Sequence, residues 1–238
     1  MTPLDRAIAR RLVVATLNRA KGRELVELLG DLGWDVALLA DVPGATLPEE
    51  TGATYRENAL LKARAAARAT GARALGDDSG LEVDALGGEP GLHSARFGGP
   101  GLDDAGRYTL LLERLRGVPP ARRTARFRCV IALVDPAGPE HVVEGIVEGA
   151  ISEAPRGRGG FGYDPVFFYP PLGRTFGELT PAEKHRVDHR GAAVRAQEAA
   201  CVPGGPVSTV GTYSSTRSLP SNGRLATISR VRSATPHA

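Results

Sequence analysis

The stretch from Gly76 to Gly99, GDDSGLEVDALGGEPGLHSARFGG, carries the densest set of side chains that could do chemistry. It places two adjacent carboxylates and a hydroxyl, Asp77, Asp78 and Ser79, between glycines. Adjacent carboxylates repel one another unless a positive charge offsets the repulsion. Mg²⁺ supplies such a charge, because it binds one or two carboxylates and keeps positions for phosphate oxygens. The motif therefore predicts a magnesium and phosphate site, and a solvated Asp-Asp-Ser-Gly turn is the simpler alternative.

A second candidate site lies where a strand meets a helix near the N-terminus. Residues 12–16 (LVVAT) form an apolar run typical of a buried strand, and a helical pattern with leucines on one face follows. Free N–H groups at a helix N-terminus attract anions, and Lys21 adds a positive charge. The segment differs from a Walker loop, since it has no G-x-x-x-x-G-K-[ST] sequence. It predicts phosphate binding, with helix capping as the simpler role for Asn18.

Further along the chain, the pattern continues to alternate strands and helices. Residues 35–41 predict a second strand. The alanine-rich segment 55–70 predicts a helix, and Lys62 is expected on its solvated face. Residues 103–116 predict another helix with a leucine-rich apolar side.

An antiparallel hairpin is predicted in the middle of the chain. Residues 124–134 (TARFRCVIALV) partly alternate in polarity, a D-P-A-G turn follows, and residues 141–147 form the returning strand. The arginines Arg123, Arg126 and Arg128 are expected on its solvent side.

Two later segments combine flat rings and basic side chains. In GRGGFGYDP (157–165), Phe161 and Tyr163 could stack on a nucleobase, or they could fill the core. Residues 178–200 predict a loop and a helix capped by Thr180. The basic side chains there belong to Lys184, His185, His189 and Arg190. They are suited to phosphate binding, although a solvated helix start is equally ordinary.

Composition limits the remaining possibilities. The chain has 238 residues and is 42% hydrophobic, enough for a core of one large domain. Cys129 and Cys201 lack metal-type spacing, and no apolar run suggests a membrane span or a signal peptide, so we expect a cytoplasmic protein. After Ala200 the chain holds four of its 30 basic residues and no acidic one. The body is therefore near neutral, and nucleic-acid binding is not expected.

Together these segments resemble the inosine/xanthosine triphosphate pyrophosphatases, a family that removes non-standard nucleotides. The resemblance spans Leu12 to about Arg195. The matching segments, in the family's order, are TLNRAKGRE (16–24), EETGATYRENALLKA (49–63), the 76–99 stretch, GGFGYDP (159–165) and LTPAEKHRVDHRG (179–191). Each segment is weakly or moderately specific, and their common order makes the resemblance strong.

The resemblance implies a fold and an activity. The fold is α/β, with an elongated mixed β-sheet flanked by helices and two lobes with a central substrate cleft, usually in a homodimer. The activity is Mg²⁺-dependent hydrolysis of ITP, dITP and XTP to the monophosphate and pyrophosphate. Residues 1–200 would form this domain. Residues 201–238, rich in Ser, Thr, Gly, Pro and Arg, are expected to be a disordered tail.

The resemblance also implies roles for individual residues. Asp78 would be the general base and a metal ligand, and Ser79 would contact substrate. Glu50 would be the second metal carboxylate, with Glu49 as an alternative, and Lys184 would hold a phosphate. The triphosphate would be held by Thr16, Leu17, Asn18, Arg19, Ala20 and Lys21. The nucleoside would be held by Phe161, Gly162, Tyr163 and Asp164, and the purine by His189 and Arg190.

Three features depart from the family pattern. Leu17 stands where the family has glycine, and its side chain could crowd the phosphates or alter the backbone that meets them. Asp188 replaces a serine before His189 and Arg190, where it could orient the histidine or compete with substrate for the arginine. The leucine-rich terminal helix of the family is replaced by AQEAAC.

These departures leave two alternatives beside the main hypothesis. The same scaffold could act on another modified nucleotide, such as a pyrimidine triphosphate in the related septum-inhibitor-like family, or the protein could bind nucleotides without hydrolysing them. Base choice is also only partly explained. A donor aimed at a 6-keto oxygen would reject adenine, but guanine is a 6-keto purine too, so this donor does not explain how guanine is excluded.

Overall fold

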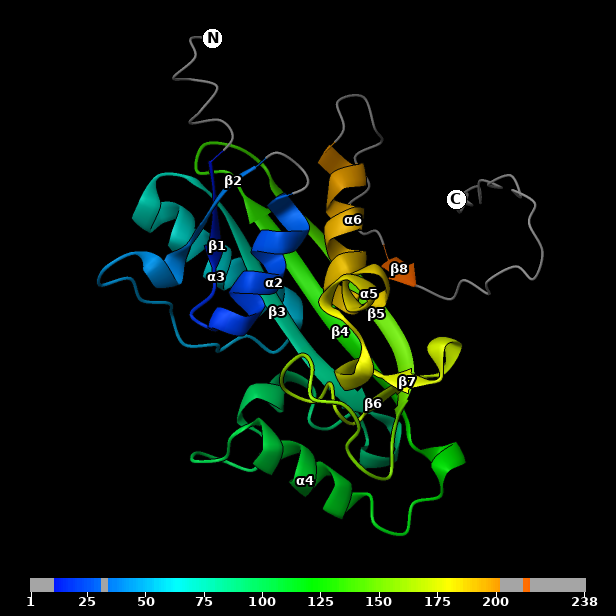
Figure 1. Ribbon diagram of the computed structural model, residues 1–238. Coiled ribbons are helices and arrows are strands. Elements are labelled where there is room, and N and C mark those ends of the chain that lie inside the picture. The colour runs from blue at the N-terminus through cyan, green and yellow to red at the C-terminus, as the bar shows by residue number, and fades with distance from the viewer. Residues whose placement is uncertain (1–10, 31–33, 202–211, 215–238) are drawn as a thin grey trace, which may run out of the picture.

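The computed structural model describes residues 11–30, 34–201 and 212–214. Within them lies a mixed eight-stranded sheet of order β2-β1-β3-β4-β5-β6-β7, with β8 beside β5 (Figure 1). The strands are β1 (Arg11–Ala15), β2 (Asp35–Leu38), β3 (Arg73–Val83), β4 (Thr124–Val134), β5 (Glu140–Ile151), β6 (Phe167–Tyr169), β7 (Arg174–Thr175) and β8 (Thr212–Ser214). Strands β1, β2 and β3 pair in parallel, and β3, β4 and β5 pair antiparallel.

Five α-helices and several short 3₁₀ helices connect the described strands. The α-helices are α2 (Arg19–Gly30), α3 (Tyr55–Thr70), α4 (Asp104–Arg114), α5 (Pro181–Val187) and α6 (His189–Cys201). The 3₁₀ helices are η1 (Leu39–Asp41), η2 (Asp84–Leu86), η3 (Gly91–Arg96), η4 (Pro120–Arg122), η5 (Pro170–Leu172) and η6 (Phe176–Glu178). The predicted α/β class is confirmed.

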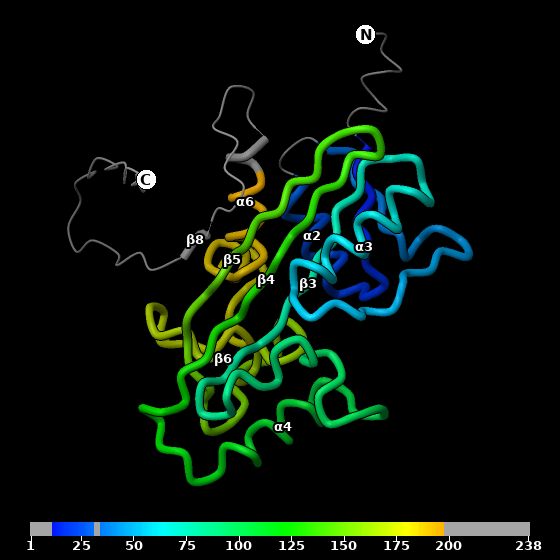
Figure 2. The backbone as a smooth tube through the Cα atoms, turned by 180° about the vertical axis from the view of Figure 1, so that it is seen from behind, coloured from blue at the N-terminus to red at the C-terminus, as the bar shows by residue number. Residues whose placement is uncertain are grey.

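Alternate residues of the central strands pack on opposite faces of the sheet, as the two-residue repeat of a strand requires. Leu12 and Val14 join the core under α2 and α6. Val13 and Ala15 join the core under α3. Figures 1 and 2 show these two layers from opposite sides, with α2 and α6 in front in the first view and α3 nearer the viewer in the second. In β3, Ala74 likewise joins the core under α3, and Leu75 joins the core under α2 and α6.

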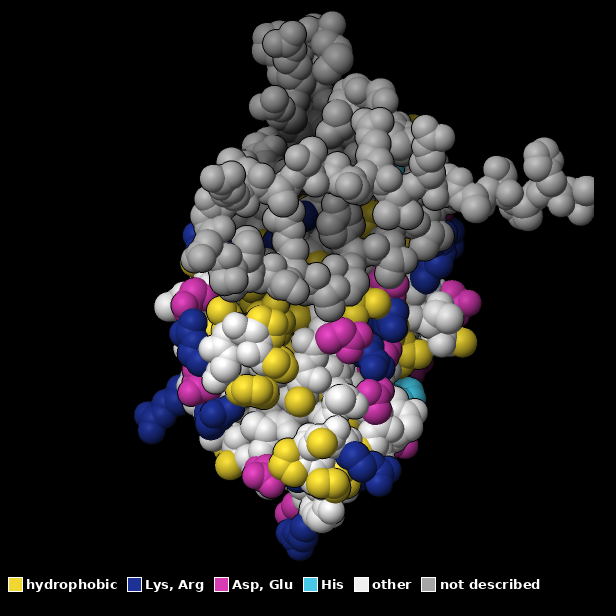
Figure 3. Space-filling view, turned by 90° about the vertical axis from the view of Figure 1, so that its right-hand side faces the viewer, with side chains coloured by type: hydrophobic (Ala, Val, Ile, Leu, Met, Phe, Trp, Pro, Cys, Tyr) yellow, Lys and Arg dark blue, Asp and Glu magenta, His cyan; other side chains and the backbone are white. Residues whose placement is uncertain are grey.

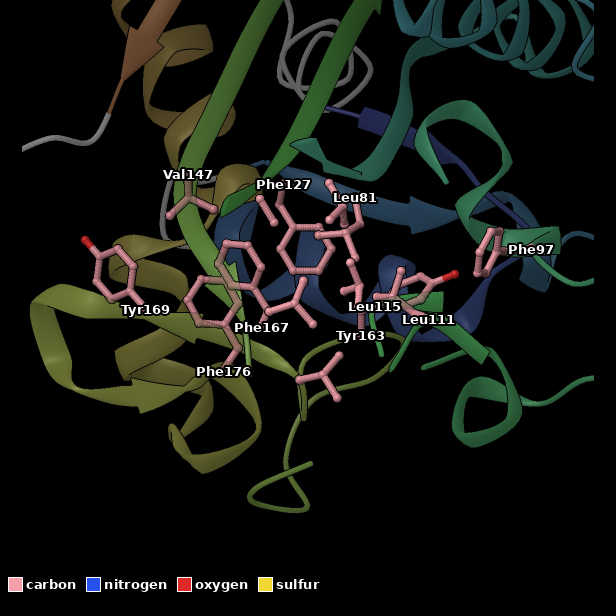
Figure 4. Close-up of a cluster of buried hydrophobic side chains, with 14 of the residues drawn as sticks. Leu81, Phe97, Leu111, Leu115, Phe127, Val147, Tyr163, Phe167, Tyr169 and Phe176 are labelled. Atoms are coloured by element: carbon pink, nitrogen blue, oxygen red, sulfur yellow. The ribbon is translucent and has the colours of Figure 1, made fainter. Parts of the chain in front are cut away.

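A separate aromatic core fills the end of the sheet near α4. Phe127 lies 4.6 Å from Phe167, and Phe167 lies 4.8 Å from Phe176, measured between ring centroids. Leu111 of α4 and Leu115, which caps the end of this helix, pack into the same cluster (Figure 4). This core fixes α4 and the loop of residues 157–165, called the 160s loop below, against the sheet.

Local sequence signals placed most elements correctly. Thr54 caps α3 by accepting from the Glu57 N–H, and Gly71 ends it in the left-handed conformation with φ 64°. Asp103 caps α4, and Thr180 forms a capping box at α5. The predicted hairpin is confirmed as β4 and β5. The predicted strand 35–41 is shorter, because its last three residues turn into η1.

Two predictions of solvent exposure are wrong. Lys62 is buried, because α3 turns this side chain inward among its alanines. Arg123 is only 5% exposed, and its guanidinium donates to backbone acceptors instead of to water. These acceptors are the carbonyl oxygens of Leu115, Val118 and Ser152. Arg123 therefore ties α4 and its following loop to the end of β5.

The other two hairpin arginines remain partly exposed and form a charged ladder across the strands. Arg126 bonds Glu148 at 3.1 Å. Arg128 bonds Glu82 at 3.0 Å and also bonds Glu144. On the face seen in Figure 3, basic and acidic side chains are likewise interspersed.

The predicted tail is described only in small part. Cys201 ends α6, and Thr212–Ser214 form β8 beside β5. The rest of residues 201–238 lies outside the described residues, so the expected disorder stays a prediction. In the part of the chain that is described, we find no helix of sufficient length and apolarity to cross a membrane.

Candidate active site

The Asp-Asp-Ser motif lies inside β3, just past the end of the parallel strand β1. β1 pairs with β3 only as far as the Ala15–Gly76 pair, whereas β3 continues beside β4. In open α/β sheets, ligands bind beyond the carboxyl ends of parallel strands. Asp77 and Asp78 are 2% and 5% exposed. The alternative of a solvated turn is therefore wrong.

Asp77 points to the face covered by α2 and α6. Its Oδ1 lies 3.0 Å from Lys21 Nζ, and its Oδ2 lies 3.4 Å from Arg190 Nε. The Cys129 thiol donates to Oδ2 at 3.1 Å. Burial favours a higher pKa for Asp77, but the two cations outweigh burial and hold this pKa well below its usual range. The ionised carboxylate thus holds two cations beside each other.

Asp78 points to the opposite face, towards α3. Its Oδ1 lies 3.2 Å from Lys62 Nζ, and its Oδ2 accepts from Asn58 Nδ2 at 3.1 Å. Burial raises the pKa of Asp78, and the negative charges of Glu50 and Asp77 add to this rise against two nearby lysines. A carboxylate with a raised pKa is a stronger base than an exposed one. The repulsion between the adjacent aspartates is thus offset, because each faces its own cation.

Glu50 shares the lysine that Asp78 contacts. Lys62 Nζ lies 2.7 Å from Glu50 Oε1, and Arg96 Nη1 lies 3.4 Å from Glu50 Oε2. Glu49 is exposed. Among the described residues, no group of three or more acidic, histidine or cysteine side chains could hold a metal ion by itself. Two carboxylates fit Mg²⁺, which completes its shell with water and phosphate oxygens.

The N-terminus of α2 faces the same region. Asn18 Oδ1 accepts from the Ala20 and Lys21 N–H groups at 3.0 and 3.2 Å, so the predicted cap is confirmed. The Asn18 N–H in turn donates to Thr16 Oγ1 at 3.1 Å. These bonds fix the turn that aims Lys21 at the carboxylate of Asp77.

Two other residues of the predicted phosphate loop point elsewhere. Leu17 is 50% exposed and lies outside the wall of the pocket. Arg19 forms an exposed ion pair with Asp41 at 3.0 Å. The concern that a leucine side chain crowds the pocket therefore finds no support in its orientation.

A pocket of about 250 Å³ joins this region to the 160s loop. It is lined by Asn18, Lys21, Ser79, Gly80, Ser94, Ala95, Asp104, Arg107, Phe127, Phe161, Gly162, Tyr163, Asp164, His189 and Arg190. Most of the residues predicted to touch substrate therefore meet at one pocket. The predicted metal carboxylates, Glu50 and Asp78, lie beside it rather than on its wall.

The 160s loop gives Phe161 and Tyr163 different roles. The Phe161 ring lies on the pocket wall, with Lys184 Nζ 4.9 Å and Arg190 Cζ 5.3 Å from its centroid. Tyr163 belongs to the aromatic core, and its hydroxyl donates to the Ser94 carbonyl at 2.9 Å. The stacking interpretation thus suits Phe161, and the core interpretation suits Tyr163.

Glu24 of α2 was missed by the sequence interpretation and organises the basic side of the pocket. Its carboxylate lies 2.6 Å from Lys184 Nζ and 2.9 Å from Arg190 Nη1. Lys184 also bonds Asp164 Oδ2 at 2.6 Å, and Arg190 Nη2 donates to Ser79 Oγ at 2.8 Å. The spacing of Glu24 three residues after Lys21 places both on one helix face, which is the signal that could have found it.

Asn58 and Lys62 were also missed as site residues. They are four residues apart on α3, so both project from one face. That face is otherwise built of alanines buried against the sheet, including Ala59 and Ala63. Polar residues within an apolar stripe are the signal that could have indicated them.

His189 is a buried, neutral histidine on the pocket wall. Its ring stacks on Phe127 with a centroid distance of 4.7 Å. Burial and the positive charges of Arg190 and Lys184 hold its pKa well below the ordinary value. Its buried Nδ1 has no hydrogen-bond partner in the described structure.

Asp188 caps α6, the helix that carries His189 and Arg190. Its Oδ1 accepts from the Gly191 N–H at 2.7 Å, whereas its buried Oδ2 has no hydrogen-bond partner among the described residues. Burial raises the pKa of Asp188 to about 6. The residue that departs from the family pattern is therefore a capping carboxylate with a stability cost at neutral pH.

Replacing Asp188 by asparagine is expected to stabilise the protein above pH 6. In the unfolded chain the carboxyl titrates at 3.8 and in the native protein at about 6, so the native state binds the extra proton between these values. Binding of this proton stabilises the native protein at low pH, and this stabilisation of about 3 kcal/mol is lost as pH rises from 4 to 6. Urea unfolding of both proteins at pH 4 and pH 8 measures this. A difference that is the same at both pH values would contradict it.

Known proteins share these elements. The sequence model of the Ham1 family matches residues 12–199. A dITP/XTP pyrophosphatase of Thermus thermophilus is 54% identical over 186 residues, covering 78% of this chain and 89% of that protein. One from Desulforamulus reducens is 51% identical over 185 residues, covering 78% and 92%. A solved Ham1 protein of Coxiella burnetii is 42% identical with a TM-score of 0.70, covering 79% of this chain and 95% of the other.

Proposed function

The chain belongs to the Ham1 family, and on that premise we propose that it hydrolyses ITP, dITP and XTP to the monophosphate and pyrophosphate. Relatives about half identical over most of the chain are dITP/XTP pyrophosphatases. The observation that carries the proposal is Lys62 holding the carboxylates of Asp78 and Glu50 together beside the pocket. A buried base next to clustered cations suits attack on a phosphate.

The substrate would lie across the end of β1. Its phosphates would meet the N–H groups of α2 and the ammonium of Lys21, because both attract anions. Its base would lie along the Phe161 ring, with Arg190 and neutral His189 beside it. The arginine can donate to a 6-keto oxygen but not to the 6-amino group of adenine, and ATP would therefore be rejected.

Asp78 would act as the general base. Its carboxylate accepts a proton from the water that attacks the α-phosphorus, the α–β anhydride bond breaks, and pyrophosphate leaves. Lys62 and Asn58 orient the two carboxylate oxygens while this happens. Bound Mg²⁺ would be held by Glu50 and Asp78 and would neutralise phosphate charge. Glu49 is less suited to this role, because Glu50 is the one that shares Lys62 with Asp78.

We also carry over the finer features of the family. Residues 1–200 would form the catalytic domain, and the pocket would be the cleft between two lobes. One lobe would contain α2 and α3, and the other would contain α4 and the 160s loop. A homodimer is expected, and sedimentation would test it.

Turnover of ITP, XTP, GTP and ATP with Mg²⁺ tests the activity, with pyrophosphate and orthophosphate resolved. We expect pyrophosphate, mainly from ITP and XTP. A folded protein that binds these nucleotides by calorimetry without turnover would refute hydrolysis and favour a binding role. A stronger preference for a modified pyrimidine triphosphate would refute the substrate assignment.

A further inference from the structure

Arg107 of α4 lies on the pocket wall with its donors poorly satisfied. Its side chain is 17% exposed, and its buried Nε has no hydrogen-bond partner in the described structure. Its ion pair with Asp104 is long, at 3.9 Å. By contrast, Lys21 and Arg190 lie within 3.0 Å of carboxylate oxygens. Arg107 is therefore a guanidinium available to a ligand.

The fold holds Arg107 towards the pocket. It is four residues before Leu111, so both project from one face of α4. Leu111 is fully buried in the aromatic core, beside Tyr163 (Figure 4). Asp104 Oδ2 accepts from the Gly162 N–H at 2.7 Å, which ties the start of α4 to the 160s loop. The position of Arg107 relative to this loop is thus fixed from two sides.

Arg107 lines the pocket from α4, whereas Asn18 and Lys21 line it from the start of α2. Figure 1 shows α2 and α4 towards opposite ends of the sheet. A nucleotide with its phosphates at the N-terminus of α2 and its base along Phe161 would extend the base edge towards α4. This step rests on the proposed function. Arg107 would then meet the base rather than the phosphates.

We infer that Arg107 reads position 2 of the purine and excludes guanine. A guanidinium is a donor only. Xanthine presents a keto oxygen at position 2, which accepts from it, and hypoxanthine presents only a hydrogen. Guanine presents an amino group, so two donors would face each other without an acceptor. Such a buried mismatch costs about 1–3 kcal/mol. Arg190 cannot supply this choice, because the 6-keto oxygen is common to all three bases.

The test compares kcat/KM for ITP, XTP and GTP in variants of Arg107. With ITP as the internal reference, Arg107→Ala is expected to lower kcat/KM for XTP and to raise kcat/KM for GTP, each by about tenfold. Arg107→Gln should raise kcat/KM for GTP further, because the glutamine amide oxygen accepts from the 2-amino group. Arg107→Lys, a donor only, should keep the wild-type order. Arg114→Ala is the matched control, since Arg114 lies on the same helix but pairs with Glu89 outside this pocket.

Ratios between nucleotides separate specificity from structural damage. If kcat/KM falls equally for all three nucleotides in Arg107→Ala and Arg107→Gln, the inference is overturned while the proposed function stays in place. A wild-type protein without turnover would instead refute the proposed function. In that case, calorimetric affinities for IMP, XMP and GMP replace kcat/KM in the comparison between bases. Affinity ratios that are unchanged in the variants would overturn the role of Arg107.

Discussion

Asp78→Asn is expected to remove nearly all turnover of ITP and XTP while the protein stays folded. An amide cannot accept the proton from the attacking water, so kcat should fall at least about a hundredfold. Its shape matches the carboxylate, and Lys62 keeps its contact with Glu50 at 2.7 Å, so the fold should hold. Pyrophosphate release at saturating ITP and Mg²⁺ measures the loss. The melting temperature shows whether the fold is kept.

Asp77→Asn is the matched control, because Asp77 adjoins Asp78 in β3 but faces the other side of the sheet. Its substitution leaves Lys21 without its carboxylate and leaves the buried Arg190 with Glu24 alone. Removing one partner of a buried ion pair costs about 3–5 kcal/mol. Asp77→Asn should therefore lower the free energy of unfolding, whereas Asp78→Asn should lower kcat. A near-normal kcat in Asp78→Asn would refute its role as the base.

The sequence predicted many of the residues that line the pocket, but it did not show how adjacent residues divide between the two faces of the sheet. Gly-Asp-Asp-Ser-Gly has the composition of a turn. It becomes a strand because residues 74–83 pair with β4, far along the chain. Gly76 also serves packing rather than flexibility, since a Cβ there would lie 2.1 Å from the Ala59 carbonyl oxygen of α3. Neither contact can be read from the local sequence.

Signals that act over a few residues were more informative. The caps at Asn18 and Thr180 were predicted, because a capping side chain bonds an N–H two or three residues later, and Thr54 and Asp103 cap α3 and α4 in the same way. The partners of Glu24 lie 160 residues or more away, at Lys184 and Arg190. A lysine such as Lys62 is ordinarily exposed, so only its tertiary partners reveal that it is buried.

Lys62→Met is expected to impair both rate and stability. The substitution leaves the carboxylates of Asp78 and Glu50 without the cation that lies between them. Breaking a buried pair costs about 3–5 kcal/mol, which urea unfolding would measure. Lys62 also lowers the pKa of Asp78 against the effect of burial. Without it, the pKa of Asp78 rises, the base stays protonated to higher pH, and kcat at neutral pH falls.

The pH profile distinguishes this electrostatic role from a packing role. In Lys62→Met, the rising limb of kcat against pH should move to higher pH, and activity should partly recover in alkaline buffer. Arg64→Met is the matched control, because Arg64 lies on the same helix and bonds exposed Glu140 at 2.6 Å. It should keep the wild-type profile. A lower kcat in Lys62→Met with an unmoved limb would show that Lys62 supports the site without tuning its base.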